Sequence, residues 1–328
     1  MSAALPLVTI IIPTRPGQAD IPAVAAARLL EYPQDRLEIL VTRGRQPAVQ
    51  RNAAIQAAQG ELIYFLDDDS RPQPGNVRRA LAHFADAQVK MLGGPNLCPA
   101  DAPPLEQVFA VVLGSWLAFG PSRARYDGVG RTRPSNEKEL ILCNLMARRD
   151  ALRDLGGFNE ALYPNEENAL MDELQKTGAK LLYDPEFSVY RRPRPTLAAF
   201  GKMLFTYGRG RAEQFRVHPT PGSGLNFVPP LFCLYLVVLL FLNFLDARSF
   251  PGMRLLATIP LLLYTVMVLT QTLVSALGKG VPRSLLAMPL LVASHLCYGL
   301  GFWRGLCTRL SLPSAKTRSD VTLEKVKL

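Results

Sequence analysis

The chain has 328 residues and a formal net charge of +10, and 48% of its residues are hydrophobic. This length allows one soluble domain of roughly 200 residues and an additional segment. Residues 1–225 carry 27 Lys and Arg against 24 Asp and Glu, whereas residues 226–328 carry 10 against 3. Because the excess positive charge lies in the most apolar part of the chain, it favours anionic lipid headgroups as partners and argues against nucleic acid.

The termini and cysteines bear on the cellular compartment. Residues 1–6 lack the basic and long apolar regions of a secretory signal peptide. The five cysteines are widely scattered, which argues against a disulfide framework or a zinc site and is typical of a reducing cytoplasm. We therefore expect the N-terminal domain to stay on the cytoplasmic side of the cell (inner) membrane.

The first hundred residues alternate between predicted strands and helices. The β-branched run Leu7–Pro13 is typical of a strand buried on both faces. Further strands are predicted at Leu37–Thr42, Leu62–Leu66 and Lys90–Gly93, and helices at Ala23–Leu30, Ala48–Gln59 and Asn76–Ala87. This order indicates an α/β, Rossmann-like domain with a mostly parallel sheet, which binds ligands at the carboxyl ends of its strands.

The rest of the N-terminal domain, which we place at residues 1–195, is less regular. Leu105–Phe119 has the pattern of a helix, and the Arg- and Gly-rich segment Pro121–Ser135 is typical of a loop or lid. Regular structure resumes at Leu140, and a strand is predicted at Lys180–Tyr183.

The C-terminal third is predicted to meet a membrane. Residues 196–225 combine spaced apolar side chains with Lys202, Arg209 and Arg211, as interfacial amphipathic helices do. Residues 226–310 hold apolar stretches, each near the roughly 20 residues that cross a bilayer. They predict about three transmembrane helices: Phe227–Leu245, Leu255–Leu277 and Leu285–Leu306. Residues 311–328 form a basic tail.

The predicted topology contains a conflict. Basic residues between Arg191 and Arg216 favour an inside location for the N-terminal domain, and three spans then put the tail outside. The tail is basic, however, and the positive-inside tendency favours keeping it inside. We predict three spans, with a re-entrant or interfacial stretch as the alternative.

Asp67, Asp68 and Asp69 directly follow the third predicted strand. Adjacent carboxylates repel one another, so a fold gains little from them without a cation. Carboxylate oxygens suit Mg²⁺ or Mn²⁺, which commonly retains one or two protein carboxylates beside substrate phosphates. A solvated acidic turn is the alternative, but the strand context favours a metal and diphosphate site.

Glu166 and Glu167 stand just before a predicted helix, where acids also stabilise the helix dipole. Alternatively, either carboxylate can serve as a general base that takes a proton from a reacting hydroxyl group.

Several ordered motifs resemble glycosyltransferase family 2, the inverting group with the GT-A fold. They are VTIIIPT (8–14), QRNAAIQAAQGELIYFLDDDS (50–70), GGFNE (156–160) and NEEN (165–168), together with the terminal spans. The closest similarity is to the membrane-bound branch that resembles succinoglycan-biosynthesis ExoA proteins.

The resemblance implies a role for each matching residue. Pro13 and Thr14 line the nucleotide pocket, and Arg51 approaches the donor. Asp67 and Asp69 are the outer acids of the metal-binding DxD motif, with Asp69 as the direct ligand and Asp68 between them. Glu167 stands at the family's base position, where Asp is usual, so Glu166 remains an alternative.

The chain also departs from the family pattern. The acidic residue that usually contacts the nucleobase after the second strand is absent, since the chain reads Val41-Thr42-Arg43-Gly44-Arg45. The Gln-x-x-Arg-Trp signature of processive synthases is absent as well. In its place stand Arg209 and Arg211, which can bind a diphosphate or a lipid phosphate or instead extend to the headgroups. We therefore expect transfer of a single sugar.

These observations predict transfer from a nucleotide-sugar donor to a polyprenyl-linked saccharide acceptor at a lipid membrane. Two alternatives remain open. One is transfer onto polyprenyl phosphate itself, and the other is a non-catalytic membrane scaffold that binds nucleotide-sugars.

Overall fold

The computed structural model describes residues 5–162, 164–217, 219, 221–244, 251–310 and 312–327. These residues form two compact units. The first contains the described residues of 1–99, 121–192 and 310–328, and the second those of 100–120 and 193–309. The predicted ends of two segments, Leu245 of the first apolar stretch and Ser311 of the tail, lie outside the described residues.

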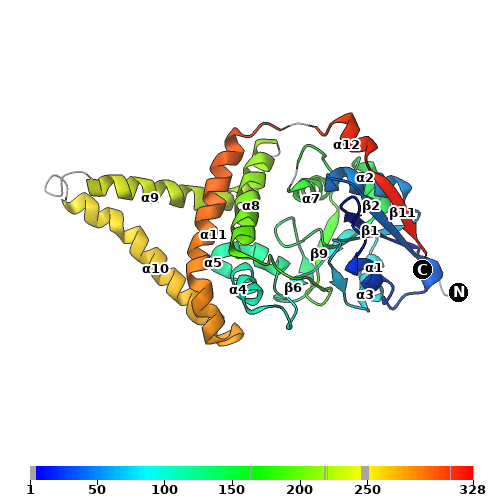
Figure 1. Ribbon diagram of the computed structural model, residues 1–328, viewed down its shortest axis with the longest axis horizontal. Helices are drawn as coiled ribbons and strands as arrows, with labels where there is room; N and C mark the ends of the chain where they lie inside the picture. The colour runs from blue at the N-terminus through cyan, green and yellow to red at the C-terminus, as the bar shows by residue number, and fades with distance from the viewer. Residues whose placement is uncertain are drawn as a thin grey trace. The chain divides into compact units, whose positions relative to one another are not determined.

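The first unit is built on an eight-stranded mixed sheet with the strand order β11-β2-β1-β3-β8-β5-β9-β7 (Figure 1). β1 pairs in parallel with β2 and β3, and β5 pairs in parallel with β9. β8 runs antiparallel between β3 and β5, and the edge strands β7 and β11 are also antiparallel to their neighbours. The strands are β1 (Val8–Thr14), β2 (Leu37–Arg43), β3 (Leu62–Leu66), β5 (Val89–Gly93), β7 (Arg133–Pro134), β8 (Asn144–Arg148), β9 (Lys180–Tyr183) and β11 (Thr322–Val326).

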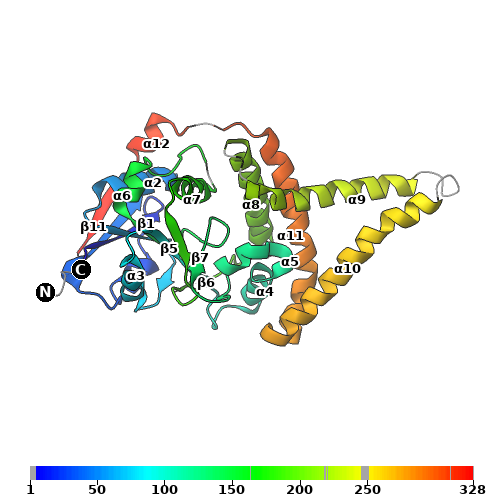
Figure 2. The same ribbon diagram turned by 180° about the vertical axis from the view of Figure 1, so that it is seen from behind.

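Helices cover both faces of this sheet, as a doubly wound fold requires. The helices of the first unit are α1 (Pro22–Ala27), α2 (Pro47–Ala57), α3 (Asn76–Phe84), α6 (Arg149–Asp154), α7 (Glu166–Lys176) and α12 (Ala315–Ser319), with 3-10 turns η1 (Gln34–Arg36) and η2 (Gly120–Arg125). Successive side chains of a strand point to opposite faces, so Ile11 and Ile12 enter different cores. Helices α2, α6 and α7 cover one core (Figure 2), and α1 and α3 cover the other.

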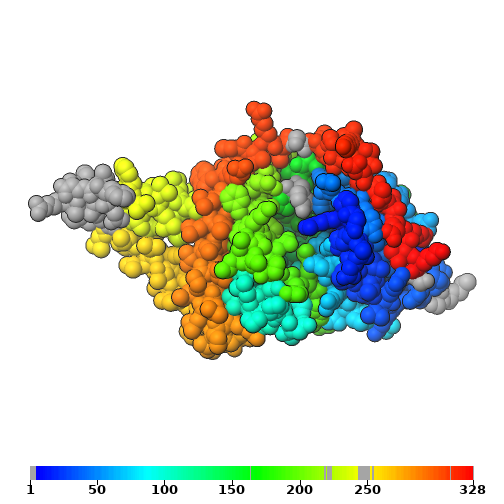
Figure 3. All heavy atoms as spheres, viewed as in Figure 1, coloured from blue at the N-terminus to red at the C-terminus, as the bar shows by residue number. Residues whose placement is uncertain are grey.

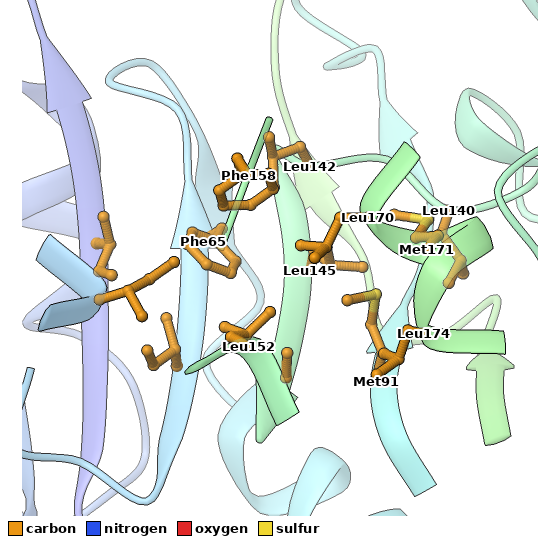
Figure 4. Close-up of a cluster of buried hydrophobic side chains, with 14 of the residues drawn as sticks. Phe65, Met91, Leu140, Leu142, Leu145, Leu152, Phe158, Leu170, Met171 and Leu174 are labelled. Atoms are coloured by element: carbon orange, nitrogen blue, oxygen red, sulfur yellow. The ribbon is translucent and has the colours of Figure 1, made fainter. Parts of the chain in front are cut away.

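Figure 4 shows the core beneath α7. Met91 of β5 and Leu145 of β8 lie beside the apolar side of the helix, whereas Phe65 of β3 lies next to Phe158. The helix contributes Leu170, Met171 and Leu174, which are spaced to share one face. This packing holds the first turn of α7, with Glu166 and Glu167, in a fixed register against the sheet.

A small second sheet joins β4 (Arg71–Pro72), β10 (Val189–Tyr190) and β6 (Asn96–Leu97). β4 comes shortly after Asp67, Asp68 and Asp69, which directly follow β3. β4 pairs antiparallel with β10, with Tyr190 opposite Arg71. The residue after β10 is therefore brought to the acidic end of β3.

Two predicted segments differ from the structure. The helix predicted at Leu105–Phe119 is two helices, α4 (Pro104–Leu113) and α5 (Trp116–Phe119), because the hydroxyl of Ser115 caps the second one. Segment Pro121–Ser135, predicted as a loop or lid, contains η2 and the edge strand β7. β7 forms because the Ser135 amide donates to the Leu181 carbonyl, which draws this segment onto β9.

The second unit is helical. Besides α4 and α5 it contains α8 (Leu197–Val217), η3 (Pro221–Phe227), α9 (Val228–Phe244), α10 (Pro251–Lys279) and α11 (Val281–Cys307). Within the described residues, three helical stretches are long and apolar enough to cross a membrane: Gly224–Leu242, Leu255–Lys279 and Val281–Cys307. They indicate membrane association.

The basic tail does not end as an irregular segment. After α12 it forms β11, which extends the main sheet beyond β2 and lies on the surface of the first unit (Figure 3). The tail therefore contributes to the same unit as the N-terminal strands.

Candidate active site

The three acids after β3 lie in a short, rigid turn. The Ser70 amide donates to the Asp67 carbonyl at 3.0 Å, and the Asp67 amide donates to the Ser70 hydroxyl at 3.2 Å. The same hydroxyl donates to the Cys143 carbonyl of the segment before β8. The turn is thus tied both to itself and to a neighbouring part of the sheet.

Cationic and amide groups of the chain surround these acids. Arg51 of α2 contacts Asp67 at 3.2 Å. Arg191, just after β10, contacts Asp67 at 2.9 Å and Asp69 at 2.5 Å. The Gln18 side-chain amide donates to Asp68 at 2.7 Å. Guanidinium groups of the chain therefore neutralise part of the negative charge for which a metal ion was expected.

Arg51 also joins the acidic turn to the start of α7. Its Nη1 contacts Glu166 Oε1 at 3.0 Å while its Nη2 contacts Asp67. Both Arg51 and Glu166 are buried, so this contact is little screened by water. Acids from distant parts of the chain are thereby brought together through a single side chain.

The two glutamates of α7 occupy different environments. Glu166 is buried, and its second oxygen, Oε2, has no hydrogen-bond partner among the described residues. Burial and the neighbouring Glu167 carboxylate raise the pKa of Glu166 to about 8, although Arg51 opposes this shift. Glu167 is only partly buried. Tyr163, shortly before this pair, lies outside the described residues.

The predicted nucleotide side lies at the carboxyl ends of β1 and β2. The Gln50 side-chain amide donates to the Thr14 carbonyl at 2.8 Å and to the Thr42 carbonyl at 2.5 Å, which ties the two strand ends together. The Thr14 hydroxyl is buried without a hydrogen-bond partner among the described residues. Pro13 beside it is partly buried.

The tail brings an acidic residue to this end of the sheet. Arg43, at the end of β2, contacts Glu324 of β11 at 3.0 Å and donates to the Gln18 carbonyl at 2.6 Å. Since Gln18 also binds Asp68, a continuous set of polar contacts runs from β11 to the acidic turn. The sequence has no acidic residue directly after β2. No local pattern predicts that Glu324, far along the chain, contacts Arg43 there.

Asn52, beside Arg51, fixes the glycine-containing segment before α7. Its amide nitrogen donates to the Phe158 carbonyl at 2.9 Å, and its Oδ1 accepts from the Phe158 amide at 2.8 Å. Gly157 has φ +82°, and a β-carbon there would overlap the Asn52 side chain. Glycine is therefore required at this position, for its backbone conformation and for the close approach.

The predicted site residues fall into two groups. Asp67, Asp68, Asp69, Arg51 and Glu166 lie together in the first unit, linked by the contacts above. Arg209 and Arg211 belong to α8 in the second unit, where Arg209 lies 3.4 Å from Glu213 and Arg211 donates to Gln214 at 3.1 Å.

In the sequence, Arg191 is only one of the basic residues that precede the apolar helices, and no site role was predicted for it. The structure instead shows it contacting the acidic turn. The signal was weak, because only the pairing of the two-residue strands β4 and β10 brings it there.

Asp67 and Asp69 are the residues that could hold a divalent metal ion. No cluster of three or more His, Cys, Asp or Glu side chains suited to a metal occurs in the part of the chain that the structure describes. The two carboxylates contact different nitrogen atoms of the same positively charged group, the Arg191 guanidinium.

Comparisons with known proteins agree on the type of domain. Residues 22–156 match the model of the glycosyl transferase family 2. The chain is 27% identical to a pre-mycofactocin glycosyltransferase of Mycobacterium tuberculosis over 53% of this chain and 36% of that protein. It is also 27% identical to the succinoglycan biosynthesis protein ExoA of Rhizobium meliloti, over 61% of this chain and 56% of that protein.

A solved structure supports the GT-A fold. A mannosyltransferase of Pyrobaculum calidifontis, in complex with GDP-Man and Mn²⁺, matches with a TM-score of 0.50 and 17% sequence identity. The match covers 88% of this chain and 86% of that one. The two curated relatives are matched over only part of their length, 36% of the pre-mycofactocin glycosyltransferase and 56% of ExoA.

Proposed function

We propose that the chain transfers a sugar from a nucleotide-diphosphate donor with inversion at the anomeric carbon, because residues 22–156 match the glycosyl transferase family 2 model. The observation that carries this proposal is the Arg51 bridge, which joins Asp67 after β3 to Glu166 at the start of α7. This bridge unites the acids suited to a metal-bound diphosphate with the pair that contains the candidate base.

Asp67 and Asp69 are our proposed metal ligands. Both supply the carboxylate oxygens that Mg²⁺ and Mn²⁺ prefer, and both already contact one cationic group, the Arg191 guanidinium. The Mn²⁺ and GDP-Man in the similar mannosyltransferase support a divalent ion and a nucleotide-sugar. When bound, the ion would hold the donor diphosphate and offset the charge that develops on the departing nucleotide.

The remaining donor contacts are assigned to residues around the strand ends. We propose that Pro13 and Thr14 line the nucleoside pocket, where the buried Thr14 hydroxyl has an unused hydrogen-bonding capacity. Asp68 and Arg51 support the diphosphate region from the turn and from α2. Arg209 and Arg211 of α8 remain proposed phosphate-binding residues.

Glu167 is our proposed general base. An acceptor hydroxyl must approach the base within hydrogen-bond distance, and the base must be ionised. Glu166 is buried against Arg51, and its raised pKa favours the protonated form at neutral pH. Glu167 is partly exposed, so it can receive a proton from the acceptor, while Glu166 positions Arg51.

We propose a membrane-associated, polyprenyl-linked saccharide as the acceptor and the cytoplasmic face of the cell membrane as the location. The long apolar helices support a lipid-bound substrate, because a soluble acceptor would give them little use. The name of the similar ExoA protein supports a role in polysaccharide synthesis. Transfer onto polyprenyl phosphate is the second candidate, and that acceptor is already an anion that needs no base.

A transfer assay on purified protein with Mg²⁺ or Mn²⁺ tests these assignments. We expect Asp69→Asn to lower metal-dependent transfer by about a hundredfold or more, the usual loss when an electrostatic contact to the transition state is removed. The control is Asp35→Asn, which changes an exposed acid on η1 and should have no effect. Normal transfer by Asp69→Asn would exclude our metal assignment.

The base is tested in the same assay. Glu167→Gln should lower transfer by roughly 10²- to 10⁴-fold, as loss of general base catalysis does, and leave donor binding intact. A fully active Glu167→Gln enzyme with an inactive Glu166→Gln enzyme would move the base by one residue. If Glu167→Gln is active and polyprenyl phosphate is the acceptor used, the second candidate function is favoured.

A further inference from the structure

The tail is joined to the main sheet by a regular strand pairing. β11 pairs antiparallel with β2 over five residue pairs, from Thr322 opposite Arg43 to Val326 opposite Ile39. Lys325 contacts the buried carboxylate of Glu38 at 2.9 Å, and Arg318 contacts Glu160 at 2.9 Å. Residues 310–328 therefore belong to the same compact unit as the N-terminal strands.

This pairing restricts how the chain can cross a membrane. The open edges and charged surface of the sheet keep it in water, on one side of the bilayer. The chain leaves this unit after residue 192 and returns to it at residue 310. The number of complete crossings between these points must be even, so α9, α10 and α11 cannot all cross. We infer that α9 and α10 cross as a hairpin, while α11 stays in the headgroup region with α8.

The tight packing of α11 on α8 identifies the helix that does not cross. The two helices run side by side in the same direction (Figures 1 and 2), since Phe205 contacts Gly301 and Arg209 contacts Gly305. β-Carbons at Gly301, Gly305 or Gly208 would overlap the backbone of the other helix. The packed half of α11 therefore has to share the environment of α8.

The environment of α8 cannot be hydrocarbon. Its sequence places charged side chains throughout the part that contacts α11: Lys202, Arg209, Arg211, Glu213 and Arg216. Moving α11 through the bilayer would move these charges into the hydrocarbon as well, which is costly for each of them. At the headgroups, the same basic side chains meet anionic lipid favourably.

Helices α9 and α10 have the opposite character. α9 contains no charged residue, and α10 carries only Arg254 and Lys279, each near an end. Only 11% and 17% of their apolar windows are buried within the protein, compared with 39% for α11. Their exposed apolar faces fit lipid chains as the partner. α9 extends away from α11, and α10 returns to the beginning of α11 (Figure 2).

This topology also removes the charge conflict in the sequence. With an even number of crossings, the basic tail residues lie on the same side as the sheet, as the positive-inside tendency favours. These residues are Arg309, Lys316, Arg318, Lys325 and Lys327.

Epitope tags at both termini of the full-length protein test the parity. In sealed membrane vesicles of one orientation, we expect a protease to remove both tags or neither. If one tag is removed while the other is protected, the number of crossings is odd and the inference fails.

Cysteine labelling identifies the crossing pair. Cys98, Cys297 and Cys307 are first replaced by alanine, while the buried Cys143 and Cys233 remain. Ala247→Cys, in the connection between α9 and α10, should react with an impermeant reagent from the side opposite the termini. Gly278→Cys, near the end of α10 where a β-carbon meets no atom within 4 Å, should react from the same side as the termini.

Other labelling patterns overturn the assignment. Reaction of both cysteines from the far side would mean that α9 and α11 cross. Reaction of Gly278→Cys alone from the far side would mean that α10 and α11 cross, and reaction of neither would mean that no helix crosses completely. Neither experiment depends on the proposed reaction.

Discussion

Arg51 contacts both Asp67 and Glu166. Its guanidinium group lowers the free-energy cost of removing these two acids from water. Without Arg51, the buried Glu166 carboxyl would lose its contact with a cation, and a buried polar group without a partner is costly. Asp67 would keep its contact with Arg191. Arg191 plays a similar part for Asp67 and Asp69. At the residue scale, the candidate site therefore contains two guanidinium groups, each of which contacts two carboxyl side chains.

Glu166 gives this network a predictable pH dependence. Its pKa is raised to about 8 by burial and by Glu167, so the folded chain holds a proton that the unfolded chain releases above the usual glutamate pKa of about 4.3. Stability from this group is present below about pH 4.3 and is lost as pH rises to about 8. We expect wild type to lose several degrees of melting temperature relative to Glu166→Gln between pH 5 and pH 8.

Thermal unfolding of both proteins in the same detergent, without divalent ions or nucleotide, measures this difference. The comparison cancels the titration of all other groups that the two proteins share. Parallel melting curves of the two proteins across this pH range would show that Glu166 has an ordinary pKa.

Glycines set the distance between two elements of the second unit. At Gly301 of α11, a β-carbon would overlap the Phe205 carbonyl of α8, and Gly208 of α8 approaches the Tyr298 carbonyl in the same way. Such close helix contacts are enriched in small residues because small side chains let the two backbones approach each other. At the element scale, α8 and α11 behave as one packed pair.

Gly301→Leu should separate this pair. The added side chain cannot be accommodated by a flexible neighbour, because backbone atoms occupy the space, and we expect a loss of about 1–3 kcal/mol typical of overpacking. Chemical or thermal unfolding in detergent measures the loss. Gly278→Leu is the matched control, since nothing lies within 4 Å of its β-carbon. Equal stability of the two variants would contradict the close packing.

At the scale of the whole molecule, the two ends of the chain are coupled through the main sheet. β11 covers the edge of β2, and Lys325 adds a contact to Glu38. Although burial opposes it, hydrogen bonds from Gln59, Thr9 and Lys325 lower the pKa of Glu38. Without β11, the edge of β2 would present unpaired backbone groups that invite pairing with other chains.

Ending the chain after residue 312 should expose this edge. We expect faster amide hydrogen exchange in β2 (Leu37–Arg43), a lower melting temperature and increased aggregation of the truncated protein. Arg318→Gln is the control, because it removes only an exposed side-chain contact to Glu160, and such a contact contributes about 0–1 kcal/mol. Unchanged exchange in β2 after truncation would show that β11 does not pair with it in solution.

Features that depend only on neighbouring residues could be predicted from the sequence. Buried strands such as Leu62–Leu66 and helices such as Pro47–Ala57 follow from local periodicity and from their Pro and Gly boundaries. The acidic turn at the end of β3 and the apolar helices after residue 226 were predictable for the same reason. The glycosyl transferase family 2 resemblance rests on the order of these local motifs, and the family match confirms it.

Contacts between residues far apart in the chain could not be predicted from the sequence. Arg191 reaches Asp67 and Asp69 through pairing of two-residue strands, and such short strands have no recognisable pattern. The antiparallel β8, the edge strand β11 and the contact of Glu324 with Arg43 likewise arise from long-range pairing. Strand pairing joins segments that are far apart in the chain, so local propensity carries little information about it. The same long-range contact of the tail is what limits the number of membrane crossings.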